Sequence, residues 1–429
     1  IDCIIDGIGN CHITQQLIHT NQSVVRCHFP SHVFTCSWPI DTENLMELGE
    51  NALNVSKLNK AIQLFRFALR VRLQTLHDSH IDVAYSYAWL GKAYDDKGEY
   101  DKAIEYYEKS LKIQLDKLGH DHPDVTNPYN RLGSVYLMKG EYDKAIEYHE
   151  ESLKIQLDKL GHDHPDVATS YNNLGNAYKS KGEYDKAIEY YEKDLKIILD
   201  KLGPDHLHVA TSYNNLGLVY KIKGEYDKAI EYYKKDLKII LDKLGYDHPH
   251  VAISYNNLGN VYKSKGEYDK AIEYYEKSLE IQLDKLGHDH PDVATSYNNL
   301  GNVYENKGEY DKAIEYYEKS LKISLNKLGH DHPDVATSYS NLAYIYCNKQ
   351  EYDKAMEFGK KSLRLRLNKL DSDHPDVGDS YSILGDINCE KGKKKEARKY
   401  YENALSIYTQ KLGKNHQKTK AVKFKLKNL

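Results

Sequence analysis

Apolar and polar residues alternate along this chain with the spacing of an α-helix. In the segment 164–205, apolar residues follow one another at spacings of four, three and four, which places them on one face of a helix. Pro165 suits the first turn of that helix, and Gly182 suits the left-handed residue after it. We therefore predict a helix that begins near Pro165 and ends before Gly182. Its apolar positions are Val167, Tyr171, Leu174 and Tyr178.

A second helix is predicted from Tyr184 to the glycine at 203. One stripe of this helix is apolar, and charged residues occupy the opposite side. Burying a Leu or Ile side chain is worth roughly 1.5–3 kcal/mol, against about 0.2–0.5 kcal/mol for an exposed charge pair. Stacking of the apolar stripes should therefore dominate stability. The stripe comprises Ala187, Ile188, Tyr191, Leu195, Ile198, Leu199 and Leu202.

The helix pair recurs every 42 residues. Nine copies fit between 38 and 415, the first of them degenerate. Repeats of this length stack because one copy cannot bury its own apolar face, so the pattern indicates an all-α solenoid. The marker positions are Gly98, Gly140, Gly182, Gly224, Gly266, Gly308, Gln350 and Gly392.

Composition narrows the classes of function. Acidic and basic residues nearly cancel, 64 against 60, and the net charge is −4. Nucleic-acid binders need a basic face that displaces counterions, so we expect no nucleic-acid partner. There is no apolar run of about 18 residues, so we expect no membrane insertion. Six cysteines, four of them near one end, cannot staple the array, which favours reduced thiols in the cytoplasm.

Residues 1–37 do not fit the repeat. They begin at Ile1 and lack the order of a signal peptide. A metal-binding patch, a Cys–His nucleophile and the edge of an upstream region are the alternatives, and the spacings match no zinc knuckle. We predict a poorly defined remnant of an upstream region, in a chain incomplete at this end. The residues in question are Cys3, Cys11, Cys27, Cys36, His12, His19, His28 and His32.

The repeat resembles a known family. A large residue, Leu-Gly, Tyr, Ala and an aromatic stand at the offsets of the tetratricopeptide pattern, although Asp194 and Ser278 stand where that pattern prefers Ala. The residues that match are Tyr171, Leu174, Gly175, Tyr178, Ala187 and Tyr191. The 42-residue period and the Leu-Gly-x-Asp-His-Pro-Asp-Val segment look like the kinesin light chain type. The resemblance covers 38–415 and implies a right-handed superhelix whose first helices line a concave groove.

By that resemblance, several positions that differ between copies line the groove. They follow the Leu-Gly pair by one and by four residues, and a groove whose chemistry changes along its length suits an extended peptide. Drift of solvent-facing residues is the alternative explanation. These positions hold Asn176, Lys179, Leu218, Lys221, Asn260, Lys263, Asn302 and Glu305.

An Asn-Asn pair recurs in four copies, and a single Asn stands in the next. Asn is a poor helix former, so its recurrence needs compensation. An amide can clamp the main chain of a bound peptide, and in related repeats the second Asn does so. The alternative is a hydrogen bond between neighbouring repeats. The second positions are Asn173, Asn215, Asn257, Asn299 and Asn341.

Other sites are set aside. A carboxylate clamp needs basic residues in the first turn, where this chain has Thr or Ile, so an acidic C-terminal tail is not the expected ligand. His-x-His segments recur, as at His162 and His164, but repeats about 10 Å apart cannot share one zinc ion. Helix-entry chemistry explains Asp-His-Pro better. We expect no metal, no cofactor and no catalytic residue.

Two local expectations concern the third copy and the end of the array. Pro128 should shorten the first helix of the third copy, with Asn127 as its cap. Residues 416–429 form a half-repeat, which we predict to be a capping helix with a solvated basic face.

The hypothesis for function is a non-catalytic scaffold or adaptor that seats an extended segment of a protein partner. One alternative is a sensor array of a larger NTPase, protease or signalling protein whose catalytic part precedes Ile1. Another is an array that self-associates end to end through 38–76 and the C-terminal half-repeat.

Overall fold

The computed structural model describes residues 2–5, 11–12, 24–29, 32–37 and 40–429. The first four ranges are strands of one sheet in the order β2-β1-β3-β4, with β1 parallel to β3 and the other neighbours antiparallel. The strands are β1 (Asp2–Ile5), β2 (Cys11–His12), β3 (Val24–Phe29) and β4 (His32–Ser37). The side chains of residues 1–39, including the cysteines and histidines discussed above, lie outside the described part.

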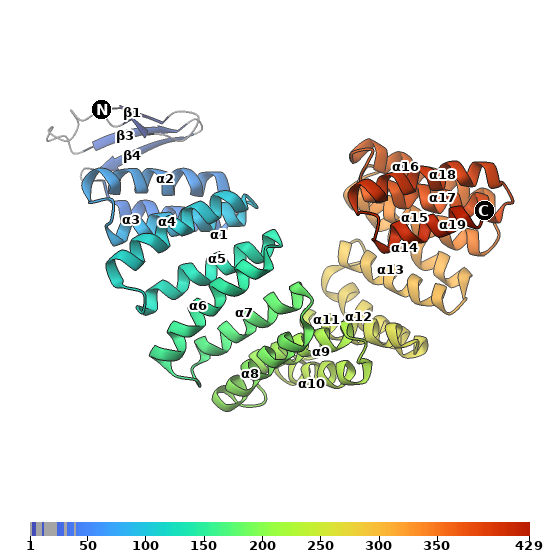
Figure 1. Ribbon diagram of the computed structural model, residues 1–429, viewed down its shortest axis with the longest axis horizontal. Coiled ribbons are helices and arrows are strands. Elements are labelled where there is room, and N and C mark those ends of the chain that lie inside the picture. The colour runs from blue at the N-terminus through green and yellow to red at the C-terminus, as the bar shows by residue number, and fades with distance from the viewer. Residues whose placement is uncertain (1, 6–10, 13–23, 30–31, 38–39) are drawn as a thin grey trace. The chain divides into compact units, whose positions relative to one another are not determined.

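Helices fill the rest of the described chain, as the apolar spacing predicts, so the all-α solenoid is confirmed for the repeats (Figure 1). The first helices of the successive pairs are α1 (Thr42–Asn54), α3 (Ile81–Asp96), α5 (Thr126–Lys139), α7 (Pro165–Lys181), α9 (Leu207–Ile222), α11 (Pro249–Lys265), α13 (Pro291–Asn306), α15 (Pro333–Asn348) and α17 (Pro375–Glu390). The second helices are α2 (Leu58–Thr75), α4 (Tyr100–Leu118), α6 (Tyr142–Leu160), α8 (Tyr184–Leu202), α10 (Tyr226–Leu244), α12 (Tyr268–Leu286), α14 (Tyr310–Leu328), α16 (Tyr352–Lys369) and α18 (Lys394–Lys411). A final helix, α19 (Gln417–Lys427), follows them.

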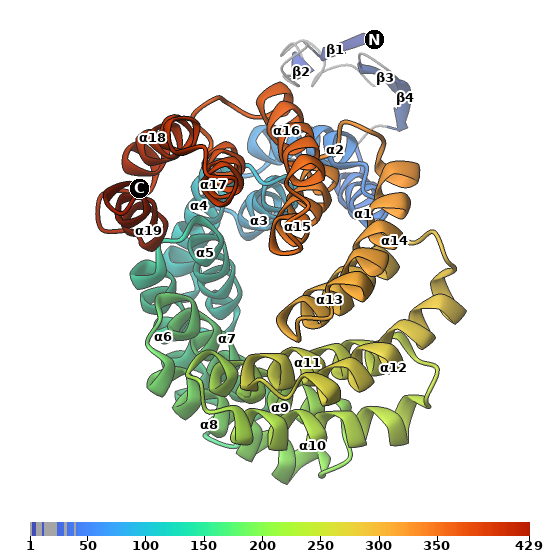
Figure 2. The same ribbon diagram turned by 90° about the vertical axis from the view of Figure 1, so that its right-hand side faces the viewer.

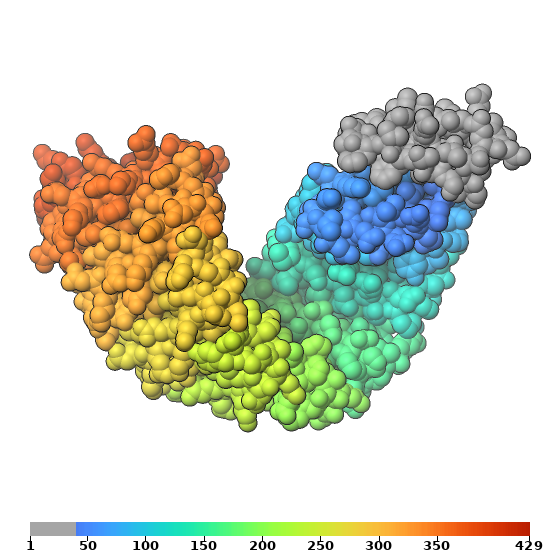
Figure 3. All heavy atoms as spheres, turned by 180° about the vertical axis from the view of Figure 1, so that it is seen from behind, coloured from blue at the N-terminus to red at the C-terminus, as the bar shows by residue number. Residues whose placement is uncertain are grey.

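The chain divides into two compact units, residues 1–219 and residues 220–429, with the boundary inside α9. Within each unit the first helices form one layer and the second helices another (Figure 2). Neighbouring repeats of a unit are in contact, as the space-filling view shows (Figure 3). Among the described residues, no helix combines the length and the apolar character that crossing a bilayer requires.

Most helix pairs close around a glycine and an aromatic ring. Gly175 of α7 faces the ring of Tyr191 on α8, and a Cβ at this glycine would lie 2.6 Å from the ring. Tyr191 is fully buried, as are Leu174 and Ala187 beside it. The Leu-Gly pair is therefore required because the two helices approach too closely for any side chain there.

The eighth copy solves the same packing problem in reverse. Ala343 stands at the glycine position, and Gly359 stands where the other copies have the aromatic. A Cβ at Gly359 would lie 2.8 Å from Leu384 of the next repeat. The two changes compensate each other, since the small residue has moved from the first helix to the second.

Helix ends follow the predicted chemistry. The Nδ1 atom of His164 accepts a hydrogen bond from the backbone N–H of Asp166 at 3.2 Å, which caps α7. Gly182 ends the helix with φ 86° and ψ 8°, the left-handed conformation that glycine adopts without steric cost. The third copy differs, because a short 3₁₀ helix, η2 (Pro123–Val125), precedes α5.

Pro128 does shorten the first helix of that copy, to 14 residues in α5 against 17 in α7. The expected cap was wrong, because His122 rather than Asn127 accepts the capping hydrogen bond, from the N–H of Asp124 at 3.2 Å. Pro128 lies within the first turn of α5, where its missing N–H interrupts no helical hydrogen bond.

Helix α19 covers the end of the second unit. Val422 is buried against α18, and Phe424 remains exposed. The basic face is partly paired rather than fully solvated, because Lys418 contacts Asp379 at 2.8 Å and Lys425 contacts Asp386 at 2.7 Å.

Candidate functional site

All the residues predicted to line a peptide groove lie on first helices. We call the surface that they share the first-helix face. In the first unit it comprises Asn173, Asn176, Lys179 and Asn215, and in the second unit Lys221, Asn257, Asn260, Lys263, Asn299, Asn302 and Asn341. Each of these side chains is half-buried, so a bound segment and the neighbouring helices can both contact them.

The paired asparagines form hydrogen bonds between repeats. Nδ2 of Asn215 donates to Oδ1 of Asn172 in the preceding repeat at 2.9 Å. Nδ2 of Asn299 donates to Oδ1 of Asn256 at 3.1 Å. Asn341 donates to Asn298 at 2.8 Å. The inter-repeat hydrogen bond that the sequence left as an alternative is thus present, and it fixes Asn215, Asn299 and Asn341 in one orientation.

Asn173 differs from these residues. By analogy with the other repeats, the amide of Asn173 would donate to Asn130 in the preceding repeat. Oδ1 of Asn130 instead lies 3.2 Å from Nδ1 of His149. His149 replaces the aromatic of the other copies and is fully buried, and burial lowers its pKa to about 4. A neutral imidazole therefore occupies this position, and the ladder of amides begins one repeat later.

The Asn that follows Leu-Gly supports the interior of its own repeat. Oδ1 of Asn176 accepts a hydrogen bond from the hydroxyl of the buried Tyr191 at 2.8 Å. Asn260 accepts one from Tyr275 at 2.9 Å in the same way. Asn302 accepts one from Tyr317 at 2.9 Å. The sequence predicted these residues only as part of the groove. It did not reveal that each also accepts a hydrogen bond from a buried tyrosine of its own repeat.

The lysines of the first-helix face are less solvated than surface lysines. Burial lowers the pKa of Lys179, of Lys221 and of Lys263, and the charge of Lys263 lowers the pKa of Lys221 further. Oδ1 of Asn176 accepts a hydrogen bond from Nζ of Lys179 at 3.0 Å. An ammonium group in such surroundings interacts more strongly with an anion than a fully exposed one does.

In the second unit the sign of charge changes along this face. Glu305 stands at the position of Lys263 in the next repeat, and burial raises the pKa of its carboxyl group. A hydrogen bond from Tyr317 at 2.5 Å and the charge of Lys263 oppose that rise. Lys221, Lys263 and Glu305 therefore form a row of two cations and one anion across three successive repeats.

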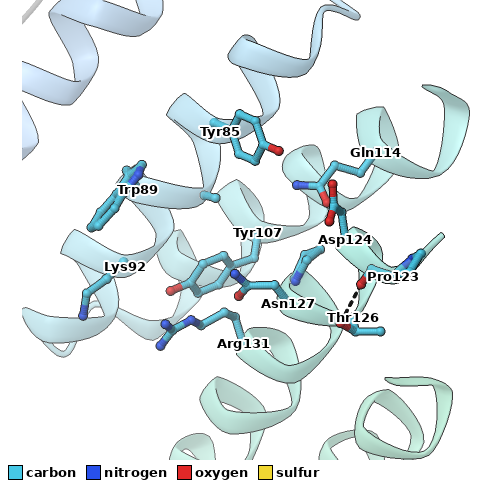
Figure 4. A pocket seen from close by; sticks show the side chains of 12 residues that line it. Tyr85, Trp89, Lys92, Tyr107, Gln114, Pro123, Asp124, Thr126, Asn127 and Arg131 are labelled. Carbon is cyan, nitrogen blue, oxygen red and sulfur yellow. Dashed lines mark hydrogen bonds between the residues drawn. The ribbon is translucent and has the colours of Figure 1, made fainter. Parts of the chain in front are cut away.

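The structure adds a pocket that sequence reasoning did not identify. It has a volume of about 470 Å³ and lies between α3, α4 and the start of α5. Tyr107 and Gln114 of α4 are among its lining residues (Figure 4). Each has a buried polar atom that has no hydrogen-bond partner in the described part of the chain. The sequence did contain a signal for this pocket, because the second copy has Lys92 where several other copies have Asn, and the third copy has Pro128 where most other copies have Ser.

The His-x-His segments serve helix entry. In the segments that end at His122, His164, His290 and His332, the second histidine accepts a hydrogen bond from the backbone N–H two residues later, and the first histidine is exposed. In the part of the chain that the structure describes, no three His, Cys, Asp or Glu side chains come together as a metal site requires.

Comparison with known proteins places these repeats in a family. The family model described as tetratricopeptide repeat matches the chain in eight overlapping segments. They are residues 41–116, 82–158, 124–199, 181–242, 208–284, 250–326, 292–368 and 334–410. No curated protein sequence matches the chain.

Several solved structures are similar to this chain. A kinesin light chain-like protein of Podosopora anserina with nearly identical repeats is 26% identical, with a TM-score of 0.44 over 48% of this chain and 97% of its own. The apo form of the quorum sensor NprR from B. thuringiensis is 17% identical, with a TM-score of 0.56 over 86% of this chain and 98% of its own. A signal transduction ATPase with a tetratricopeptide repeat sensor, from Pyrococcus horikoshii, is 20% identical, with a TM-score of 0.57 over 90% of this chain and 54% of its own.

Proposed function

The chain belongs to the tetratricopeptide repeat family, and on that basis we propose that it is a non-catalytic scaffold or adaptor. Its ligand is an extended segment of a partner protein, which lies along the first-helix face of one unit. The sensor array of a larger NTPase or protease remains the alternative, but the likeness to the Pyrococcus protein extends only to the fold.

The arrangement of the second asparagines carries this proposal. In Asn215, Asn299 and Asn341, one N–H is used in the ladder between repeats. Each amide group keeps its carbonyl oxygen and a second N–H for a ligand. These two groups match the donor and acceptor of a peptide backbone, which an extended segment presents along its whole length.

The ladder also lowers the cost of binding. A free Asn side chain loses rotamer entropy when a ligand fixes it, and that loss reduces affinity. Here the bond to the preceding repeat already fixes the amide. The inter-repeat bond and the peptide clamp are therefore compatible, since the first prepares the second.

Charge sets the expected polarity of the segment in the second unit. Acidic residues of the partner should lie over Lys221 and Lys263, and a hydrogen-bond donor should lie over Glu305. Successive repeats are about 10 Å apart, so about three residues of an extended peptide separate these contacts.

The test is a comparison of two fourfold variants of the full chain. One replaces the second asparagines, Asn173, Asn215, Asn257 and Asn299, by Ala. The other replaces the first asparagines, Asn172, Asn214, Asn256 and Asn298, by Ala and serves as the control. Both variants weaken the ladder, but only the former removes the proposed clamp. Proteins recovered in pull-downs are quantified by mass spectrometry, and circular dichroism verifies folding.

We expect the second-position variant to lose most of its partners. The first-position variant should retain them with reduced recovery, because it loses preorganisation alone. Equal recovery of every partner by the wild-type chain and by both variants would refute the assignment of the first-helix face.

A further inference from the structure

The pocket between α3, α4 and α5 is the place where two contacts of the repeat are missing at once. In Figure 4 the ring of Tyr107 crosses the middle of the pocket, and Gln114 lies at one end beside Asp124. Tyr107 is 1% exposed and Gln114 is 3% exposed. The hydroxyl of the former and Oε1 of the latter have no partner among the described residues.

Tyr107 lacks the acceptor that other copies supply. Its counterparts Tyr191, Tyr275 and Tyr317 each donate to an Asn one residue after Leu-Gly. In the ninth copy an Asp serves, because Tyr401 donates to Oδ1 of Asp386 at 2.7 Å. The second copy has Lys92 at this position, and an ammonium group has no acceptor to offer.

Gln114 lacks the donor that other copies supply. Its counterpart Gln156 accepts a hydrogen bond from the hydroxyl of Ser170 at 2.6 Å. Gln282 likewise accepts one from Ser296 at 2.7 Å. The third copy has Pro128 in place of this serine, so the oxygen of Gln114 has lost its partner.

Other residues that line the pocket also differ from their counterparts in the other copies. Trp89 and Arg131 occupy the position of the second Asn in the second and third copies, so the ladder of amides is replaced here. Tyr85 adds a second aromatic side chain, at a position where the fourth copy has Thr169. Tryptophan, tyrosine and arginine are the residues on which binding surfaces most often depend.

The two ends of the pocket have opposite hydrogen-bonding character. Tyr107 OH, Lys92 and Arg131 offer donors at one end, and Oε1 of Gln114 and the carboxylate of Asp124 offer acceptors at the other (Figure 4). Residues 107 and 114 are two helical turns apart on α4, about 10 Å. An extended peptide covers that distance with about three residues.

We propose that this pocket binds a partner segment that replaces both missing groups. The segment presents an Asp to Tyr107, Lys92 and Arg131, and a Ser or Thr hydroxyl to Gln114, with about three residues from one to the other. Lys92 is already paired with Asp96 at 3.2 Å, so Arg131 is the cation that favours Asp over Asn at that end. The inference rests on the proposed function and specifies one subsite of it. Asn127 and Arg131 are both exposed and lie beside the Tyr107 ring, so their side chains can move aside when the ligand binds.

The experiment uses the full chain with Trp38→Phe, which leaves Trp89 as the remaining tryptophan of the two. The probes are short synthetic peptides of Ala and Leu that carry one Asp and one Ser, in both orders and at several separations. Matched peptides have Asp→Ala or Ser→Ala. Binding is followed by the fluorescence of Trp89.

The decisive variant restores the contacts of the sister copies, by Lys92→Asn and Pro128→Ser in the same chain. Its internal groups are satisfied, so it should unfold at the same temperature as the parent or at a higher one. We expect at least one peptide to shift the emission of Trp89, and the restored variant to bind that peptide about tenfold more weakly or worse, as the loss of one or more hydrogen bonds requires. Pro128→Ser alone should weaken the binding of the Ser-containing peptide but not of its Ser→Ala partner.

Three results would overturn the proposal. The first is that no peptide of the series shifts the emission of Trp89. The second is that the parent and the restored variant bind the peptides equally. The third is that the restored variant unfolds at a lower temperature than the parent. None of them would affect the assignment of the first-helix face, which depends on the asparagine variants. Loss of partners from the second-position Asn variant together with silent Trp89 fluorescence would therefore reject the pocket and leave the wider proposal in place.

Discussion

Two buried aspartates should make the helices around them less stable at neutral pH than in mild acid. Asp194 of α8 is 6% exposed, and its Oδ2 accepts a hydrogen bond from the hydroxyl of Ser212 at 2.6 Å. Burial raises the pKa of Asp194 to about 6, and the Ser212 bond and the charge of His208 offset that rise only in part. Asp236 repeats the arrangement with Ser254 and also has its pKa raised to about 6 by burial. Most other copies have Ser at this position.

The sign of the effect follows from proton binding. Between about pH 4 and pH 6 the folded chain holds a proton on each aspartate that the unfolded chain has released, so stability falls as pH rises through this window. A rise from 3.8 to about 6 corresponds to about 3 kcal/mol for each residue at neutral pH. Asp194→Asn keeps an acceptor for Ser212 and removes the charge. The variant should therefore gain up to about 3 kcal/mol at pH 7.5 and almost nothing at pH 4.

Parts of a repeat array open locally, so a local measurement isolates the effect at residue 194. Amide hydrogen exchange of α8 and α9, corrected for the intrinsic exchange rate, reports the opening free energy around residue 194. Glu189→Gln is the matched control, because it removes an exposed carboxylate from the same helix. A gain of equal size at both pH values, or no gain at pH 7.5, would contradict the assignment of the cost to ionisation.

Three further predictions concern other contacts. Burial holds the pKa of His149 near 4, so the folded chain binds fewer protons than the unfolded chain below about pH 6.5. The free energy of unfolding should therefore fall by about 3 kcal/mol between pH 6.5 and pH 4. Thermal unfolding at a series of pH values would reveal this loss, and His149→Tyr should abolish it. Gly301→Ala should cost about 1–3 kcal/mol in urea unfolding, because its Cβ would lie 2.6 Å from the ring of Tyr317. Lys181→Ala, which removes the exposed pair with Asp143, should leave the melting temperature unchanged at low and high salt.

The fold could be predicted because its determinants are local and repeated. Apolar spacing identifies a helix within a single copy, and Pro165 and Gly182 mark its ends through backbone conformation alone. The start of the first helical segment in the third copy could not be predicted as readily, because His122 caps η2 and α5 itself has no side-chain cap. His122 and Asn127 both have side chains able to cap, and the choice between them depends on the 3₁₀ turn that Pro123 begins.

The placement of the candidate residues on first helices could be predicted from the sequence, but the residues to which they bond could not. Asn215 and Asn172 are 43 residues apart, and their bond depends on how one repeat is set against the next. The same is true of Asn176, whose partner Tyr191 lies on the second helix of the same repeat. Spacing along one helix gives the face on which a residue lies, and packing between helices decides what that face contacts.

Differences between copies are informative when the partner of the changed residue is considered with it. Ala343 and Gly359 depart from the repeat together, and the second change accommodates the first, so this pair is explained by packing alone. Lys92 and Pro128 depart without such a compensating change, and each leaves a buried polar atom that has no partner among the residues that the structure describes. A buried group in that state costs about 1–3 kcal/mol, so two of them at one junction are expensive for stability and are accounted for if a ligand supplies what is missing. Uncompensated departures of this kind separate a binding position from ordinary drift, which exposed positions such as Ser180 and Ser264 cannot do.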